Sequence, residues 1–91
     1  MQNTISFELN GKKYVSKPFD FEAFCLINEA HVNTPSKYSH SSIYRVGGAA
    51  IDHMFEGTEA TQEIIDELSI PEKAKLAHAA WKIYAEEIKN V

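Results

Sequence analysis

The N-terminal residues alternate between apolar and polar side chains, which is the period of a half-buried β-strand. The apolar members of this alternation are Ile5, Phe7 and Leu9. The dipeptide Asn10-Gly11 follows and favours a type I′ turn, because both central residues of that turn have positive φ. A return strand over 12–16 completes a predicted β-hairpin at about 4–16. Since an isolated hairpin is not stable in water, we expect its apolar face to pack on the helices that follow.

Beyond the hairpin, apolar residues recur at helical spacing. The predicted helices span about 20–31, 42–56, 59–68 and 71–89. Asp20 and Thr58 are suited to cap the first and third helices, and Gly57 suits the C′ position that ends the second. Residues Val32–Ser41 contain proline and several serines and are predicted to form a loop. We therefore predict one α+β, mostly α, domain over 1–91, with the hairpin packed on a bundle of about four helices.

The helix over 42–56 is apolar on more than one face. Its apolar residues form two stripes that cover more than half of the circumference, which is typical of a helix at the centre of a bundle or between a core and a partner. The narrow polar strip that remains consists of Arg45, Asp52, His53 and Glu56. Gly47-Gly48 costs the helix about 1 kcal/mol per glycine relative to alanine. We expect another helix to approach the backbone closely there, and a hinge is the alternative.

The final helix is predicted to start at Ser69-Ile70-Pro71-Glu72, because proline suits the first turn. Its predicted core seam has coiled-coil-like spacing and consists of Ala74, Ala77, Trp81, Tyr84 and Ile88. Leu76 and Ile83 form a second, thinner apolar stripe. The predicted solvated face consists of Lys75, His78, Lys82, Glu86 and Lys89.

Composition narrows the range of functions. The net charge of −4 argues against general nucleic-acid binding. The chain has no apolar run of membrane-spanning length and no signal-peptide pattern at its start, so we expect a cytoplasmic protein with no membrane partner.

The single cysteine, Cys25, lies in an apolar run and is expected to be a small buried residue in a reducing compartment. A chain of this size buries only roughly two thirds of its unfolded surface, so a homo-oligomer or a partner would support its stability.

The chemically active residue types are dispersed along the chain. Asp52-His53 is an adjacent acid–imidazole pair, but adjacent residues on a helix do not face each other. No two histidines have the i, i+4 spacing of a helical metal site. Gly47-Gly48 follows no strand and lacks the lysine of a phosphate-binding loop. We therefore predict a protein that is not an enzyme, with no catalytic residue, no metal and no cofactor.

Three segments nonetheless carry a family resemblance. FELNGKKYVSKPFDFEAFCLINE, near the N-terminus, resembles the start of the small tail assembly chaperones of long-tailed, Gram-positive-type bacteriophages and prophages. YRVGGAAIDHMFEGTEATQEIIDEL looks like the second block of those proteins, and KAKLAHAAWKIYAEEIKN looks like their C-terminal helix. The resemblance covers nearly the whole chain.

The resemblance implies a role in phage tail assembly. Members of this family bind the long, helical tape measure protein, help to recruit tail tube protein, and are absent from the finished virion. Helix-in-groove binding is the mode we expect. The apolar residues that we predict to contact a partner are Ile43, Tyr44, Val46, Met54, Phe55, Leu76 and Ile83. Each of these residues is equally suited to the core, and two other functions stay open: a structural tail or head-completion subunit, and a small regulatory protein-binding module.

Overall fold

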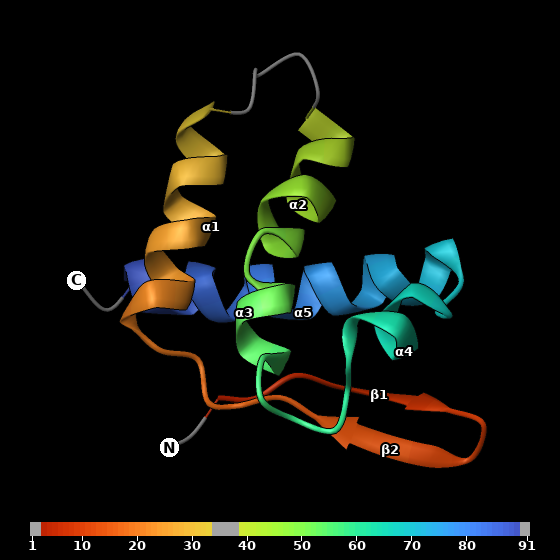
Figure 1. Cartoon of the computed structure of the whole chain (residues 1–91). Helices are drawn as coiled ribbons and strands as arrows, with labels where there is room; N and C mark the ends of the chain where they lie inside the picture. The colour runs from red at the N-terminus through yellow and green to blue at the C-terminus, as the bar shows by residue number, and fades with distance from the viewer. Residues whose placement is uncertain (1–2, 34–38, 90–91) are drawn as a thin grey trace.

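The computed structural model describes residues 3–33 and 39–89 and has the predicted α+β class, with an N-terminal hairpin packed on helices (Figure 1). In chain order the elements are β1 (Ser6–Leu9), β2 (Lys12–Val15), α1 (Phe21–Asn33), α2 (Ser39–Gly48), α3 (Ile51–Phe55), α4 (Gln62–Asp66) and α5 (Ile70–Lys89). The long helix α5 lies behind α1, α2 and α3, and the hairpin packs at one end of this arrangement (Figure 1).

The hairpin forms as its sequence predicts. Asn10 and Gly11 have φ of 52° and 80°, as a type I′ turn requires. The turn sets an antiparallel register in which Phe7 faces Tyr14, and their stacked rings have centroids 5.1 Å apart. Phe7 also meets the edge of the buried Phe55 ring, at 5.4 Å between centroids. These ring contacts attach the hairpin to α3, which supplies the support that an isolated hairpin lacks.

Helix α1 begins where the sequence predicts but extends further. The Asp20 carboxylate accepts a hydrogen bond of 2.8 Å from the Ala23 N–H, which confirms the predicted N-cap. Helix α1 continues to Asn33 and α2 begins at Ser39, so the connection between them is shorter than the predicted loop over 32–41. The rest of that predicted loop, 34–38, lies outside the described residues.

The predicted continuous helix over 42–56 is wrong: Ala49 and Ala50 separate α2 from α3. At this break the N–H groups of both alanines bond three residues back, as in a turn, and Ala50 adopts φ −97° and ψ −8°. Gly47 lies where α2 packs closely on α5. A Cβ atom built on Gly47 would overlap the carbonyl group of Ala77 in α5, so the predicted close approach of another helix is confirmed there. No atom lies within 4 Å of a Cβ built on Gly48, the last residue of α2.

The turn that follows α3 also differs in part from the prediction. Gly57 has a φ of 78° directly after the C-cap Glu56, which confirms its predicted C′ position. Thr58 does not cap the next helix, which starts at Gln62; its hydroxyl donates to the Phe55 carbonyl at 2.6 Å and accepts from the Ala60 N–H at 3.2 Å. Thr61 caps α4 instead, accepting from the Ile64 N–H at 3.4 Å. Helix α4 is therefore shorter than the predicted 59–68.

Helix α5 starts with the predicted cap, and it buries two residues of the predicted seam, Ala77 and Tyr84, on a face that otherwise differs. The Ser69 hydroxyl accepts from the Glu72 N–H at 3.3 Å and the Glu72 carboxylate accepts from the Ser69 N–H at 3.4 Å, which is a capping box. The Ser69 hydroxyl also donates to that carboxylate at 2.8 Å. Its buried residues are Leu76, Ala77, Ala80 and Tyr84. Ile88 of the predicted seam is 46% exposed. The face differs because α5 packs against α1, α2, α3 and β1 together, which no single coiled-coil seam allows. The predicted solvated face is exposed throughout.

Candidate functional site

Most of the large apolar residues lie in one core, and the exceptions mark a candidate site. The large apolar residues that are exposed are Val15, Phe21, Val32, Tyr44, Ile70 and Ile88. Tyr44 is 49% exposed and Ile70 is 85% exposed, and both line one hollow although they lie on different helices. Apolar side chains that gather at a hollow are typical of an interaction site, whereas single exposed apolar residues are ordinary.

This hollow has a volume of about 410 Å³ and lies between α2, α3, α4 and α5. Its remaining lining residues are Gly48, Ile51, Asp52, Gln62, Ile65, Asp66, Lys73, Ala74, Leu76 and Ala77. Ile51 and Ile65 are themselves buried in the core. The hollow therefore has an apolar floor that belongs to the core and a rim that carries the charged groups.

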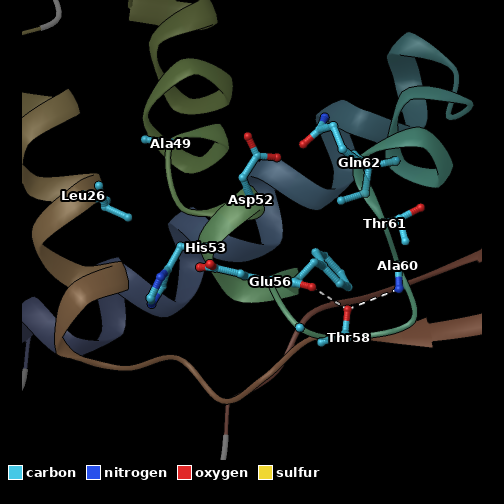
Figure 2. A pocket seen from close by; sticks show the side chains of 12 residues that line it. Leu26, Ala49, Asp52, His53, Glu56, Thr58, Ala60, Thr61 and Gln62 are labelled. Carbon is cyan, nitrogen blue, oxygen red and sulfur yellow. Dashed lines mark hydrogen bonds between the residues drawn. The ribbon is translucent and has the colours of Figure 1, made fainter.

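A second hollow of about 720 Å³ adjoins the first along α3 and α4 (Figure 2). It extends from Leu26 in α1, across Ala49 and Phe55, to Thr61 and Gln62 at the start of α4. The two hollows have three lining residues in common: Asp52, Gln62 and Ile65. We call the two together the α4 groove.

The structure places only part of the predicted contact set in this groove. Tyr44 and Leu76 line the same hollow, as one binding surface would require. Phe55 lines the second hollow. Four of the predicted contact residues are core side chains, with exposed fractions of 1–2%: Val46, Met54, Phe55 and Leu76. Leu76 and Phe55 therefore belong to the floor of the groove. A side chain that has no exposed area has none to bury on a partner. Ile43 and Ile83 are half-buried and line neither hollow.

Ile70 is the groove residue that sequence reasoning did not find. It is the first residue of α5, directly after the capping residue Ser69, and it belongs to neither predicted apolar stripe of that helix. The available signal was an apolar residue beside Pro71 at a helix start, where polar residues are usual. Its position in the groove depends on α4, which folds back next to it (Figure 1).

The charged groups of the groove are mainly acidic. Asp52, Glu56 and Asp66 line it, and Lys73 is the ammonium group among the lining residues. Asp66 accepts a hydrogen bond from the Gln62 amide at 2.9 Å, which does not neutralise its charge. Within residues 3–33 and 39–89, neither Asp52 nor Glu56 is paired with a cation.

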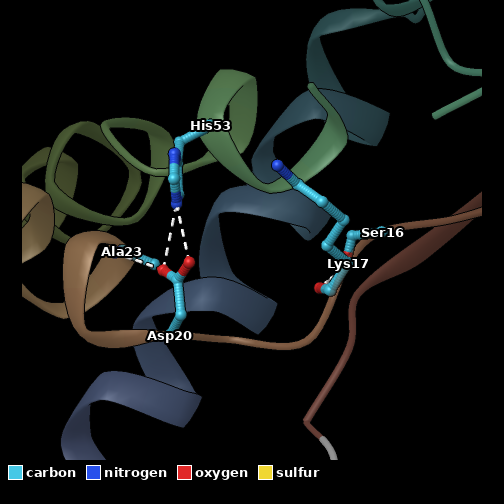
Figure 3. Close-up of polar contacts among 5 residues, drawn as sticks. All are labelled: Ser16, Lys17, Asp20, Ala23 and His53. Atoms are coloured by element: carbon cyan, nitrogen blue, oxygen red, sulfur yellow. Dashed lines mark hydrogen bonds and ion pairs between the residues drawn. The ribbon is translucent and has the colours of Figure 1, made fainter. Parts of the chain in front are cut away.

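His53 lines the groove but directs its ring away, toward Asp20 (Figure 3). Its Nε2 atom lies 3.0 and 3.1 Å from the two carboxylate oxygens of Asp20, so the partner of His53 is not the adjacent Asp52. The pKa of Asp20 lies below its usual value, first because the carboxylate accepts the Ala23 N–H and then because of His53. The pair therefore fastens α3 to the start of α1 and has the geometry of a structural contact.

The described residues show no cluster of side chains suited to metal binding. No three His, Cys, Asp or Glu side chains among them lie close enough together to hold a metal ion. Cys25 is half-buried, which corrects the predicted full burial, and it lines neither hollow. The described part of the chain also contains no helix that is both long enough and apolar enough to span a membrane.

No family model, no curated protein and no solved structure matches this chain significantly.

Proposed function

We propose that this protein is a non-catalytic tail assembly chaperone of a bacteriophage or prophage, which binds helical segments of the tape measure protein in the α4 groove. In this role it also recruits tail tube protein, acts in the bacterial cytoplasm and is absent from the mature virion. The partners are those that the sequence resemblance implies. The α4 groove is a surface suited to binding a helical partner.

The observation that carries the proposal is that Tyr44 and Ile70, exposed apolar residues of two different helices, line one apolar hollow. A hollow that is floored by core residues and flanked by exposed apolar side chains accepts the apolar stripe of a helix. Burying a large apolar side chain contributes about 1.5–3 kcal/mol. A long tape measure protein presents such a stripe many times, so many copies of a small domain could cover it and keep it soluble.

The test is co-expression of the full chain with the tape measure protein encoded beside it, followed by affinity capture and light scattering. We expect capture of an otherwise insoluble tape measure protein at many copies per chain. Ile70→Asp should weaken this binding roughly tenfold or more, because it removes one buried apolar contact.

The chain offers a matched control for this variant. Phe21 is the first residue of α1, follows an N-cap and is 80% exposed, as Ile70 is the first residue of α5, follows an N-cap and is 85% exposed. An aspartate in the first turn suits either helix. Phe21→Asp should therefore leave binding unchanged. If both variants bind like the wild type, the α4 groove is not the docking site.

Mass spectrometry of the purified virion separates the proposal from a structural role. A tail assembly chaperone should be missing from the virion. Detection at a fixed copy number in mature particles would instead identify a structural tail or head-completion subunit.

A further inference from the structure

We infer that the helix received by the α4 groove is basic, with Lys or Arg residues flanking its apolar stripe. This inference rests on the proposed function and names the chemistry of the partner segment. It comes from the charges around the groove, which the apolar contacts do not explain.

Three carboxylates and one ammonium group line the groove: Asp52, Glu56, Asp66 and Lys73. All three acidic residues are exposed, and Lys73 is half-buried. Within the described part of the chain, Asp52 and Glu56 have no cationic partner. Asp52 and Glu56 are also four residues apart across α3, where like charges oppose each other. The groove therefore carries a surplus of negative charge that a cationic partner would neutralise.

The positions of these acidic residues strengthen the charge argument. Glu56 is the C-cap of α3, and Asp66 is the last residue of α4. A helix C-terminus favours cations over carboxylates. Helix α4 has no basic residue in its last turn, and the histidine in the last turn of α3 is held by Asp20. Two carboxylates thus lie at helix C-termini that border the groove, and cations on a bound helix would stabilise both.

A second copy of this chain fits the groove poorly. The chain has a net charge of −4, so two copies repel each other overall. A basic amphipathic helix satisfies both the apolar floor and the acidic rim. Electrostatic complementarity of this kind raises association rates and sets partner choice.

The test uses the full chain and two synthetic helical peptides with the same leucine stripe at i, i+3, i+4 and i+7. One peptide carries lysine at the flanking positions, and the other carries glutamate there. Binding is measured by fluorescence anisotropy at low and at high salt. We expect the lysine peptide to bind about tenfold more tightly at low salt, because each exposed ion pair changes affinity by roughly two- to fivefold. The difference should shrink at high salt.

Charge-neutralising variants locate the effect. Asp52→Asn with Asp66→Asn should remove most of the preference for lysine, and the amide oxygen introduced by the second substitution can still accept the hydrogen bond from Gln62. The control, Glu29→Gln with Glu86→Gln, changes net charge equally at exposed positions that do not line the groove. This control should retain the preference.

The outcomes separate the two proposals. Equal affinity for both peptides, abolished by Ile70→Asp, overturns the inference and leaves helix binding in the groove intact. Failure of both peptides to bind removes the groove as a helix site, and the inference with it. If the control variant loses its preference for the lysine peptide to the same extent, the attraction is to overall charge and the inference is overturned. A protein mass in solution twice that of one chain, measured without peptide, also overturns it.

Discussion

The contact between Gly47 and α5 allows a sharp test of how this fold is held together. A Cβ atom at position 47 would overlap the Ala77 carbonyl oxygen and lie 2.6 Å from its carbonyl carbon and 3.1 Å from its Cα. Optimal separations of such atoms are about 3.5–4.0 Å. Because the opposing atoms are backbone, no side-chain rotation relieves the overlap. In Gly47→Ala, α2 and α5 would have to separate by roughly 1 Å.

We expect Gly47→Ala to lower the free energy of unfolding by about 3 kcal/mol, the upper end of the cost of overpacking. Alanine has a higher helix propensity than glycine by about 1 kcal/mol, which offsets only part of a larger steric cost. Small domains have stabilities of roughly 5–15 kcal/mol, so this is a large fraction of the total. The corresponding fall in Tm is roughly 12–24 °C.

Gly48→Ala is the matched control, since a Cβ atom at that position meets nothing within 4 Å. It should leave the free energy of unfolding unchanged or raise it by about 0.4–1 kcal/mol, because alanine lowers the conformational entropy of the unfolded chain. Urea denaturation followed by circular dichroism measures both variants, and equal m-values would show that the shift is one of stability. If Gly47→Ala is as stable as Gly48→Ala, the close packing of α2 on α5 is not a feature of the folded protein.

Two further predictions concern polar contacts. Tyr84→Phe removes the hydroxyl that donates to the Asn28 amide oxygen at 2.8 Å, and it should cost about 1 kcal/mol in urea denaturation; an unchanged midpoint would show that water replaces this bond. Asp20→Asn keeps an N-cap but removes the charge that faces His53. The pKa of Asp20 is lowered in the folded state. The stability that its charge contributes is therefore fully present above the unfolded-state pKa of about 3.9 and is lost as the pH falls through the folded-state pKa. The wild-type advantage over Asp20→Asn should therefore narrow in acid, and a constant difference from pH 6 to pH 2 would contradict this assignment.

The groove illustrates how far sequence reasoning reaches toward a site. Tyr44 and Leu76 are both predicted contact residues, but on separate stripes of separate helices. Only the packing of α2 beside the start of α5 brings them to one hollow. Val46 and Met54 have the same apolar character as Tyr44, and the tertiary structure buries them completely. An apolar stripe predicts that a side chain avoids water and does not identify what covers it.

Features that depend on a few neighbouring residues follow from the local sequence. Asn10-Gly11 specifies the hairpin turn, Asp20 and Ser69 specify helix starts, and Gly57 specifies a helix end. Steric limits and short-range hydrogen bonds determine each of these features, so the local sequence contains what they need.

Features that depend on distant partners arise only in the folded chain. The close packing of Gly47 on Ala77 joins residues thirty positions apart along the chain, and the buried face of α5 follows from the elements packed on it. Local propensity is worth about 1 kcal/mol per residue, whereas burying one large side chain is worth about 1.5–3 kcal/mol. Long-range packing can therefore outweigh local propensity, and here the packing of α2, α3, α4 and α5 forms the groove beside α4.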